Sequence, residues 1–257
     1  MDNSDILNYR VIGNGYPVVF LHGFLESIEM WNYFSFENNF KCVLVDLPGH
    51  GDSSHFSKAS TSMNLMANEV RKVIDKLSLS DYSVVGHSMG GYVGLELKKL
   101  DRRCRELVLL NSNFWQDSEL KKEERKRVAE IVKRNKNLFL YEAIPNLFND
   151  PVTYDNAIKT IIAEAKSMEA TTIGMISLAM AERIDFEREL VDFSHKILIV
   201  QGEFDTIVPK EKMDEALLAL PEIHVEYIKS GHMAHIEETE KTEKIIRDFL
   251  KQKTETY

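Results

Sequence analysis

The 257-residue sequence has few cysteines and no long apolar segment. Its two cysteines, Cys42 and Cys104, lie far apart and match no metal or redox motif, so we expect buried free thiols in a reducing compartment. No apolar run approaches the ~20 residues that span a bilayer. Residues 1–5 are acidic and lack the basic and apolar regions of a signal peptide. These absences predict a cytoplasmic protein with no membrane association.

Positive charge is also scarce. With 32 Lys and Arg against 41 Asp and Glu, the formal net charge is −9, which argues against nucleic acid or an anionic membrane as a partner. Hydrophobic residues make up 44% of the chain and charged residues 28%, as in globular proteins with a substantial core. No repeat, linker or low-complexity segment is present. A chain of this length is compatible with one α/β unit.

Short apolar runs alternate with helical patterns over most of the chain. An edge strand is expected at residues 9–12, and continuous apolar runs predict strands that are buried on both faces. These lie at residues 17–21, 41–45, 82–85, 106–111, 196–201 and 224–228. Apolar residues at helical spacing predict helices at residues 66–77, 92–100, 210–219 and 237–250. Residues 14–15 (Asn-Gly) are typical of a hairpin turn. The alternation predicts an α/β fold with a mostly parallel sheet.

The alternation stops between about residues 113 and 192, where no strand is predicted. We expect a charged helix at 119–136, a second helix that begins with Asp150 as N-cap before a proline, and a third helix at 170–182. The charged helix is more typical of a solvated surface than of a carboxylate-binding patch. The chain is therefore predicted to consist of an α/β core, residues 1–113 and 193–257, interrupted by a helical insertion at residues 114–192.

One serine lies between a predicted strand and a predicted helix. Gly86 and Gly90 stand two residues before and two residues after Ser88. A serine at a sharp strand-to-helix turn has strained backbone angles, and its neighbours at these positions must be nearly free of side chains. Such a turn exposes the hydroxyl above the sheet. It also directs the N–H of Met89, at the helix N-terminus, toward a developing oxyanion.

A nucleophilic serine needs a base that is oriented by an acid. Asp205 follows the strand at 196–201, and His232 follows the strand at 224–228. Catalytic groups gather at the carboxyl ends of parallel strands, so we predict a triad of Ser88, Asp205 and His232. Phe24 follows another strand, where its N–H would be the second oxyanion donor.

Several neighbouring polar residues are weaker candidates for catalysis. Glu203 competes with Asp205 for the role of acid, and His235 competes with His232 for that of base. The side chain of His87 is expected to point away from the serine, and His22 and His50 are expected to brace loops. The histidines do not show metal-ligand spacing, so no metal is predicted.

Five motifs in order resemble those of the α/β-hydrolase superfamily, in its serine-nucleophile type with a helical cap. They lie at residues 22–24 (His-Gly-Phe), 46–51 (Asp-Leu-Pro-Gly-His-Gly), 86–91 (Gly-His-Ser-Met-Gly-Gly), 202–205 (Gly-Glu-Phe-Asp) and 231–235 (Gly-His-Met-Ala-His). The resemblance covers nearly the whole chain, and the helical insertion lies where the family inserts its cap. His195 and Thr239 stand where relatives often have proline, which are structural positions.

The resemblance implies hydrolysis of a small carboxylic ester or thioester through an acyl-enzyme on Ser88, with no cofactor. A serine nucleophile disfavours haloalkane dehalogenases and epoxide hydrolases, which have aspartate at this position. The same triad also serves C–C bond hydrolases, cofactor-free perhydrolases and the lyase that forms the menaquinone precursor ring. A ligand-binding receptor or scaffold that retains the fold is a further alternative.

The partner expected from this resemblance is a small-molecule acyl substrate, and the protein is expected to be a monomer or a homodimer. If the helical insertion covers the site, it should help to form an apolar acyl pocket with Ser88 at its floor. The candidate lining residues are Phe24, Trp115, Leu147, Met175 and Met180. Apolar residues on helices more often belong simply to the core.

Overall fold

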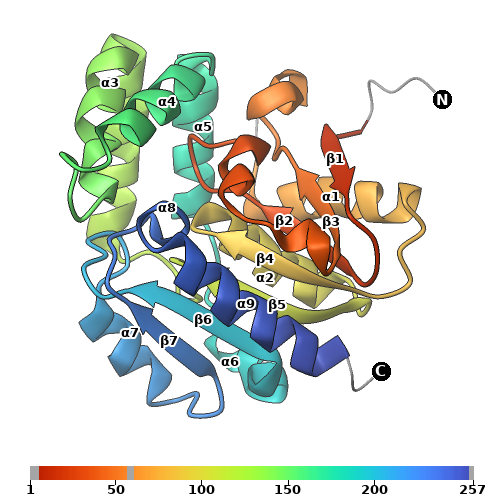
Figure 1. Ribbon diagram of the computed structural model, residues 1–257. Helices are drawn as coiled ribbons and strands as arrows, with labels where there is room; N and C mark the ends of the chain where they lie inside the picture. Colours follow the sequence, from red (N-terminus) through yellow and green to blue (C-terminus); the bar gives the residue numbers. More distant parts are fainter. Residues whose placement is uncertain (1–5, 57–60, 255–257) are drawn as a thin grey trace.

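A seven-stranded sheet forms the centre of the computed structural model, which describes residues 6–56 and 61–254 (Figure 1). Its strands are β1 (Tyr9–Ile12), β2 (Pro17–Leu21), β3 (Lys41–Val45), β4 (Tyr82–His87), β5 (Cys104–Leu110), β6 (Ile197–Gly202) and β7 (His224–Ile228). Their order is β1-β3-β2-β4-β5-β6-β7, and only β1 runs antiparallel to its neighbour. This confirms the predicted α/β class with a mostly parallel sheet.

Strand β1 does not form a hairpin with β2, so the hairpin expected from residues 14–15 is wrong. It pairs with β3, with Tyr9 opposite Val45 and Ile12 opposite Cys42. The residues of β1 are half-buried or exposed, whereas those of β3 after Lys41 are buried. The more apolar strand therefore takes the inner place beside β2, and β1 forms the edge.

Helices cover both faces of the sheet. Side chains alternate along the strands, so Val19 and Val84 join one buried cluster while Val18 and Val85 join the other. The first cluster includes residues of α1 (Met63–Lys76) and α2 (Met89–Leu100), and the second includes residues of α9 (Thr239–Thr254). In Figure 1, α9 crosses in front of the sheet and α2 lies behind it.

The remaining helices are shorter or lie outside these two layers. They are α3 (Glu119–Ala143), α4 (Asp155–Ala165), α5 (Ala170–Ala181), α6 (Glu187–Leu190), α7 (Lys210–Leu217) and α8 (Ala234–Glu237). Short 3-10 helices are η2 (Ile28–Tyr33), η3 (Phe36–Asn38), η4 (Gly51–Phe56), η5 (Pro145–Leu147) and η6 (Val191–Lys196).

Between β5 and β6 the chain forms helices α3 to α6 and no strand, and α3, α4 and α5 gather at one end of the sheet (Figure 1). Helix α3 is longer than predicted and is kinked at Asn135, where φ is −154° and ψ is 81°. Helix α4 begins at Asp155 and not beside Asp150, because the Asp150 carboxylate caps a separate turn through the N–H groups of Val152 and Thr153. The division into a core and an insertion stays a prediction.

Both cysteines are free and buried. Burial raises the pKa of Cys42 and that of Cys104 to about 12, so neither thiol is a reactive thiolate near neutral pH. Within residues 6–56 and 61–254, no helix is both long and apolar enough to cross a membrane.

At the Ser88 turn, the backbone at Gly90 lies so close to β2 that a side chain there should destabilise the fold. A Cβ there would lie 2.1 Å from the carbonyl oxygen of Leu21. Because backbone must move to relieve this contact, Gly90→Ala should lower the free energy of unfolding by about 3 kcal/mol, measured by urea denaturation. The control is Gly174→Ala, where the added Cβ meets its nearest atoms at 3.4 Å. That variant should stay within about 1 kcal/mol of wild type; equal losses in the two variants would contradict the argument.

Candidate active site

Ser88 occupies a strained turn between β4 and α2. Its φ is 49° and its ψ is −114°, a conformation that costs a non-glycine residue about 1–3 kcal/mol. Three hydrogen bonds hold it: the Ser88 N–H donates to the carbonyl of Leu110 (3.0 Å), and the Ser88 carbonyl accepts from the Gly91 N–H (3.0 Å) and the Ser112 hydroxyl (2.7 Å). The surrounding strands and helix therefore impose the conformation that presents the serine hydroxyl.

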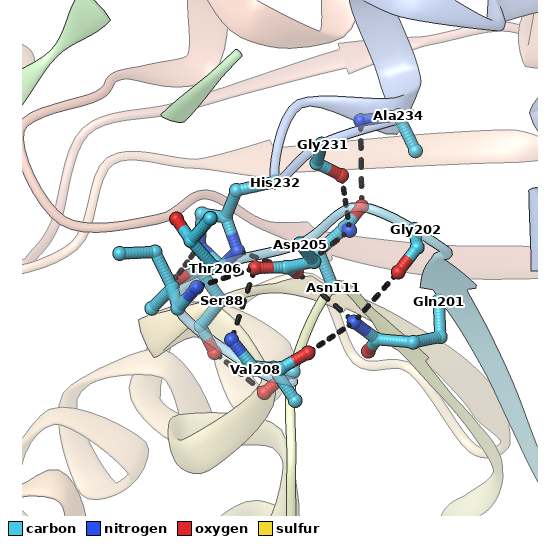
Figure 2. A network of polar contacts seen from close by, with 12 residues as sticks. Ser88, Asn111, Gln201, Gly202, Asp205, Thr206, Val208, Gly231, His232 and Ala234 are labelled. Atoms are coloured by element: carbon cyan, nitrogen blue, oxygen red, sulfur yellow. Dashed lines mark hydrogen bonds and ion pairs between the residues drawn. The ribbon is translucent and has the colours of Figure 1, made fainter. Parts of the chain in front are cut away.

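The structure brings together the three side chains predicted as a triad. His232 Nε2 lies 2.8 Å from Ser88 Oγ, and His232 Nδ1 lies 2.8 Å from Asp205 Oδ2. Each residue follows a strand, β4, β6 or β7, at its carboxyl end. Figure 2 shows His232 between the other two. The sequence order Ser, Asp, His thus becomes one hydrogen-bonded chain.

Asp205 is buried and fixed as an anion. Its Oδ1 accepts the N–H groups of Ile207 (2.8 Å) and Val208 (2.9 Å). Burial by itself raises the pKa of Asp205, but the facing His232 ring and these hydrogen bonds outweigh it and lower the pKa below its ordinary value. An ionised Asp205 accepts a hydrogen bond from His232 Nδ1–H, which leaves Nε2 unprotonated and able to accept the proton of Ser88.

Two residues that sequence reasoning missed support the acid. The amide groups of Asn111 and Gln201 donate to Asp205 Oδ2 at 3.0 and 3.1 Å. Asn111 also donates to the carbonyl of Gly231 and accepts the N–H of Ala234, so it joins the loops of the acid and the base (Figure 2). Asn111 has a φ of 45° and follows β5 directly, a position at which polar residues of a parallel sheet are candidates for a site.

The two predicted oxyanion donors have no acceptor of their own. Within the described part of the chain, no hydrogen bond uses the N–H of Phe24 or that of Met89. Leu25, with φ 69°, donates instead to His50 Nε2 at 3.3 Å. The ring nitrogens of His22 also bond loop backbone atoms, so His22 and His50 brace the loop that carries Phe24.

A buried ion pair connects this loop to the base. Glu26 Oε2 accepts the N–H of Gly23 at 2.6 Å and lies 2.9 Å from His87 Nδ1. His87 Nε2 lies 2.9 Å from the carbonyl oxygen of His232, whose own N–H donates to the carbonyl of Leu147 at 2.7 Å. The ion pair and these hydrogen bonds therefore hold together the loop that carries Phe24, the loop that carries His232, and η5 after α3.

Both members of this pair are charged. Burial raises the pKa of Glu26, but the charge of His87 and its hydrogen bond outweigh it and hold that pKa at about 2. Burial lowers the pKa of His87, but Glu26 and the two hydrogen bonds raise it above its ordinary value. Both acceptors are satisfied only by an imidazolium, which donates from each nitrogen. His87 lines the cavity, but its two ring nitrogens bond Glu26 and the His232 carbonyl, which fits the structural role expected of it.

The competing acid and base do not enter the hydrogen-bonded chain. Glu203 is half-buried, and in the described residues no hydrogen bond joins its side chain to His232. His235 is fully buried, and neither of its ring nitrogens has a partner among the described residues. Burial lowers the pKa of His235 to about 3. The geometry therefore favours Asp205 and His232.

A cavity of about 310 Å³ opens beside Ser88 and His232. Its walls are mostly apolar, and they include three of the predicted pocket residues, Phe24, Leu147 and Met180. The helical segment supplies much of the lining, so it forms the wall that faces the serine. Such a cavity is large enough for a small ligand.

Trp115 and Met175 do not line this cavity. Trp115 packs edge-on against Phe114, and the ammonium group of Lys212 lies 4.9 Å from its ring centre. Met175 is half-buried on α5, five residues before Met180. Five residues turn a helix by about 140° from the original face, so the two methionines face different sides.

Among the described residues, no group of three or more His, Cys, Asp or Glu side chains is placed to hold a metal ion. The site consists of a hydroxyl, an imidazole, a carboxylate and two backbone donors. These groups fit acyl transfer by general base and nucleophilic catalysis.

The comparisons with known proteins identify the family. Residues 18–244 match the model of the Alpha/beta hydrolase family, so the chain belongs to that family. A thermophilic esterase from Thermogutta terrifontis, in a malate-bound structure, is 30% identical with a TM-score of 0.88, over 96% of this chain and 93% of that chain.

Two curated relatives are more distant. The 2-hydroxy-6-oxononadienedioate/2-hydroxy-6-oxononatrienedioate hydrolase 2 of Pseudomonas putida is 24% identical, over 95% of this chain and 91% of its own length. The dihydrolipoyllysine-residue acetyltransferase component of the acetoin cleaving system of Pseudomonas putida is 26% identical over 92% of this chain. This chain spans 64% of the length of that acetyltransferase component.

The Glu26–His87 pair predicts a defined pH dependence of stability. A lowered carboxyl pKa stabilises the fold above about pH 4.5 and loses this effect as the pH falls toward 2. A raised histidine pKa stabilises it below about pH 6.5 and loses this effect as the pH rises through the folded-state value. Glu26→Gln should therefore cost most between pH 4.5 and 6.5, by about 3 kcal/mol, in urea denaturation.

The control for this prediction is Glu29→Gln. Glu29 lies in the same region and pairs with Arg10, but both side chains are more than two-fifths exposed. Its loss should cost less than about 1 kcal/mol. A loss in Glu26→Gln that is equally large at pH 5.5 and pH 9 would show that the charged state of His87 does not matter.

Proposed function

We propose that the protein is a serine hydrolase that cleaves a small carboxylic ester or thioester through an acyl-enzyme on Ser88. The observation that carries this proposal is the chain of two 2.8 Å hydrogen bonds from Ser88 through His232 to Asp205, at the edge of a mostly apolar cavity. The proposal includes a small-molecule acyl substrate, no cofactor, and a cytoplasmic monomer or homodimer. Helices α3 to α5 act in it as the cap of the acyl pocket.

In the proposed mechanism, His232 Nε2 takes the proton of Ser88 while Oγ attacks the acyl carbonyl carbon. The Phe24 and Met89 N–H groups bind the resulting oxyanion. The intermediate collapses, the bond to the alcohol or thiol breaks, and His232 returns its proton to that leaving group. Water, deprotonated by His232, then attacks the acyl-enzyme and releases the acid with Ser88 reprotonated. Asp205 stabilises the imidazolium in both halves.

The relatives support ester hydrolysis as the first candidate and C–C bond hydrolysis as the second. The 30% identical relative is an esterase, whereas the Pseudomonas putida relative is a hydrolase of 2-hydroxy-6-oxononadienedioate. C–C hydrolysis would require turnover of a β-diketone or vinylogous ketone by the same serine. Parallel assays of p-nitrophenyl acyl esters and β-diketones distinguish these candidates. Binding of both compound types without turnover would favour the receptor alternative.

The nucleophile is tested by covalent labelling. A fluorophosphonate should label the wild-type protein once, at Ser88, because His232 activates only this hydroxyl. Ser88→Ala should abolish labelling and ester turnover while leaving the melting temperature close to that of wild type. Ser167→Ala is a matched control that should keep labelling, because the exposed Ser167 hydroxyl donates to the Glu164 carbonyl and does not line the cavity. Labelling that persists in Ser88→Ala would falsify the assignment of the nucleophile.

The acid is tested by two amide substitutions. Asp205→Asn removes the acceptor for His232 Nδ1–H, and the resulting wrong tautomer should lower kcat by about 10⁴-fold. Glu203→Gln should change kcat by less than about threefold, because Glu203 has no bond to the base in the described structure. The measurement is kcat for p-nitrophenyl acetate hydrolysis. A larger loss in Glu203→Gln than in Asp205→Asn would assign the acid to Glu203.

A further inference from the structure

The cavity beside Ser88 contains two basic side chains from one helix. Lys121, Arg125 and Val128 of α3 all line it, and their spacing of four and three residues places them on one helix face. The other walls, such as Phe139, are mainly apolar. Of the two, the Arg125 side chain is largely buried, and a buried charge is costly unless it is paired.

Arg125 belongs to a buried cluster with an excess of positive charge. Its Nε donates to Asp117 Oδ2 at 2.6 Å, and the other oxygen of Asp117 accepts from Arg183 Nη1 at 2.7 Å. Asp117 and Arg183 are buried, and the Arg125 side chain is 14% exposed. One carboxylate thus faces two guanidinium groups, which leaves a net charge of +1 in this cluster.

The two arginines differ in how fully their donors are used. Arg183 also donates to the carbonyls of Trp115 and Met180 and to Asn113, and it stacks 4.1 Å from the ring centre of Tyr92. Its role is to hold the loop and α5 together.

Arg125 has donors left over. Its Nη1 contacts Met180 Sδ at 3.4 Å, a weak acceptor that also lines the cavity. In the described part of the chain, Arg125 Nη2 has no acceptor. Arg125 lines the cavity, and its guanidinium has the planar donor arrangement that suits a carboxylate.

Lys121 adds a second, movable cation one helical turn away. Its ammonium group bonds Glu124 at 2.9 Å, in a pair whose side chains are both at least two-fifths exposed. Exposed pairs of this kind contribute little, so the ammonium can leave Glu124 for a ligand in the cavity. A purely structural role, in which the basic residues of α3 only anchor the helix to Asp117, would explain Arg125. It would not explain why Lys121 lines the same cavity.

We propose that the substrate of this site is an ester whose acyl chain ends in a carboxylate, bound by Arg125 and Lys121. This inference rests on the proposed ester hydrolysis and names its substrate class, a monoester of a dicarboxylic acid. The reaction consumes the monoester and water and yields the alcohol, the dicarboxylate and one proton. The carbonyl of the ester lies at Ser88, and the remote carboxylate gives the cationic cluster its missing counter-charge.

The test compares monoethyl adipate with ethyl hexanoate, two ethyl esters with six-carbon acyl chains that end in a carboxylate and a methyl group. The measurement is kcat/KM from released ethanol at neutral pH. The wild-type protein should prefer monoethyl adipate by about 10- to 100-fold, since each charged hydrogen bond is worth one to two orders of magnitude. Equal or greater kcat/KM for ethyl hexanoate would overturn the inference.

Three variants and one control test which residues cause the preference for the monoester. Arg125→Gln and Lys121→Gln should each lower the ratio of the two kcat/KM values by about tenfold, mainly through KM for the monoester, because the contact forms already in the ground state. Arg125→Lys should restore part of the ratio. Lys126→Gln is the matched control: Lys126 lies on the same helix, pairs with Glu123 at the surface and does not line the cavity. That control should leave the ratio unchanged.

The outcomes separate the two proposals. If ethyl hexanoate is hydrolysed through Ser88 but the ratio does not change in Arg125→Gln and Lys121→Gln, the carboxylate inference fails and ester hydrolysis stands. If neither ester is hydrolysed and Ser88 is not labelled by a fluorophosphonate, both fail. Arg125→Gln leaves Asp117 paired with Arg183, and Lys121 lies in an exposed pair, so melting temperatures near that of wild type should show that both variants fold.

Discussion

The close contact between the start of α2 and the ends of β2 and β4 is the constraint on which the site depends. At Gly90 there is room for no side chain against the carbonyl of Leu21, and the backbone of Ser88 is held at a positive φ. This contact fixes the Ser88 hydroxyl above the sheet and brings the N–H of Met89 to the end of β2, where Phe24 follows. The positions of the proposed nucleophile and the proposed oxyanion donors therefore depend on one backbone packing, and neither can be moved alone.

The structure contains two buried charge clusters near the cavity, and they differ in net charge. Glu26 and His87 are matched one to one, and their donors and acceptors are used by the loops they join. The charges and hydrogen-bonding groups of such a cluster are satisfied without a ligand. The cluster of Asp117 with Arg125 and Arg183 has one more positive than negative charge, and Arg125 lines the cavity. We propose that a carboxylate ligand supplies the counter-charge that this cluster lacks.

The parts of the fold and site that could be predicted from the sequence are those that local chemistry dictates. Continuous apolar runs gave the strands of the parallel sheet, and the spacing of Gly86 and Gly90 gave the turn at Ser88. Asp205 and His232 could be named because they follow strands, and the carboxyl ends of parallel strands meet at one edge. The comparisons identify the family and leave the role of each residue a prediction.

What could not be predicted depends on packing between segments that are distant in the sequence. The β1–β2 hairpin failed because the pairing of β1 with β3 is a tertiary choice. The bond of His87 to Glu26 could not be predicted because it joins residues more than sixty positions apart. Met175 and Met180 are the same residue type on one helix, and only the rotation of α5 about its axis decides which of them lines the cavity.

The charged helix α3 shows this limit most directly. From its sequence, a solvated surface was the better prediction than a carboxylate-binding patch, because most of its lysines pair with glutamates three residues away. Such a pattern does not reveal which face packs on the protein. Once α5 lies against α3, Ser177 donates to the carbonyl of Arg125 and Met180 contacts its guanidinium. That packing places Arg125 in the cavity wall, so the lining of the cavity depends on helix packing and cannot be predicted from composition alone.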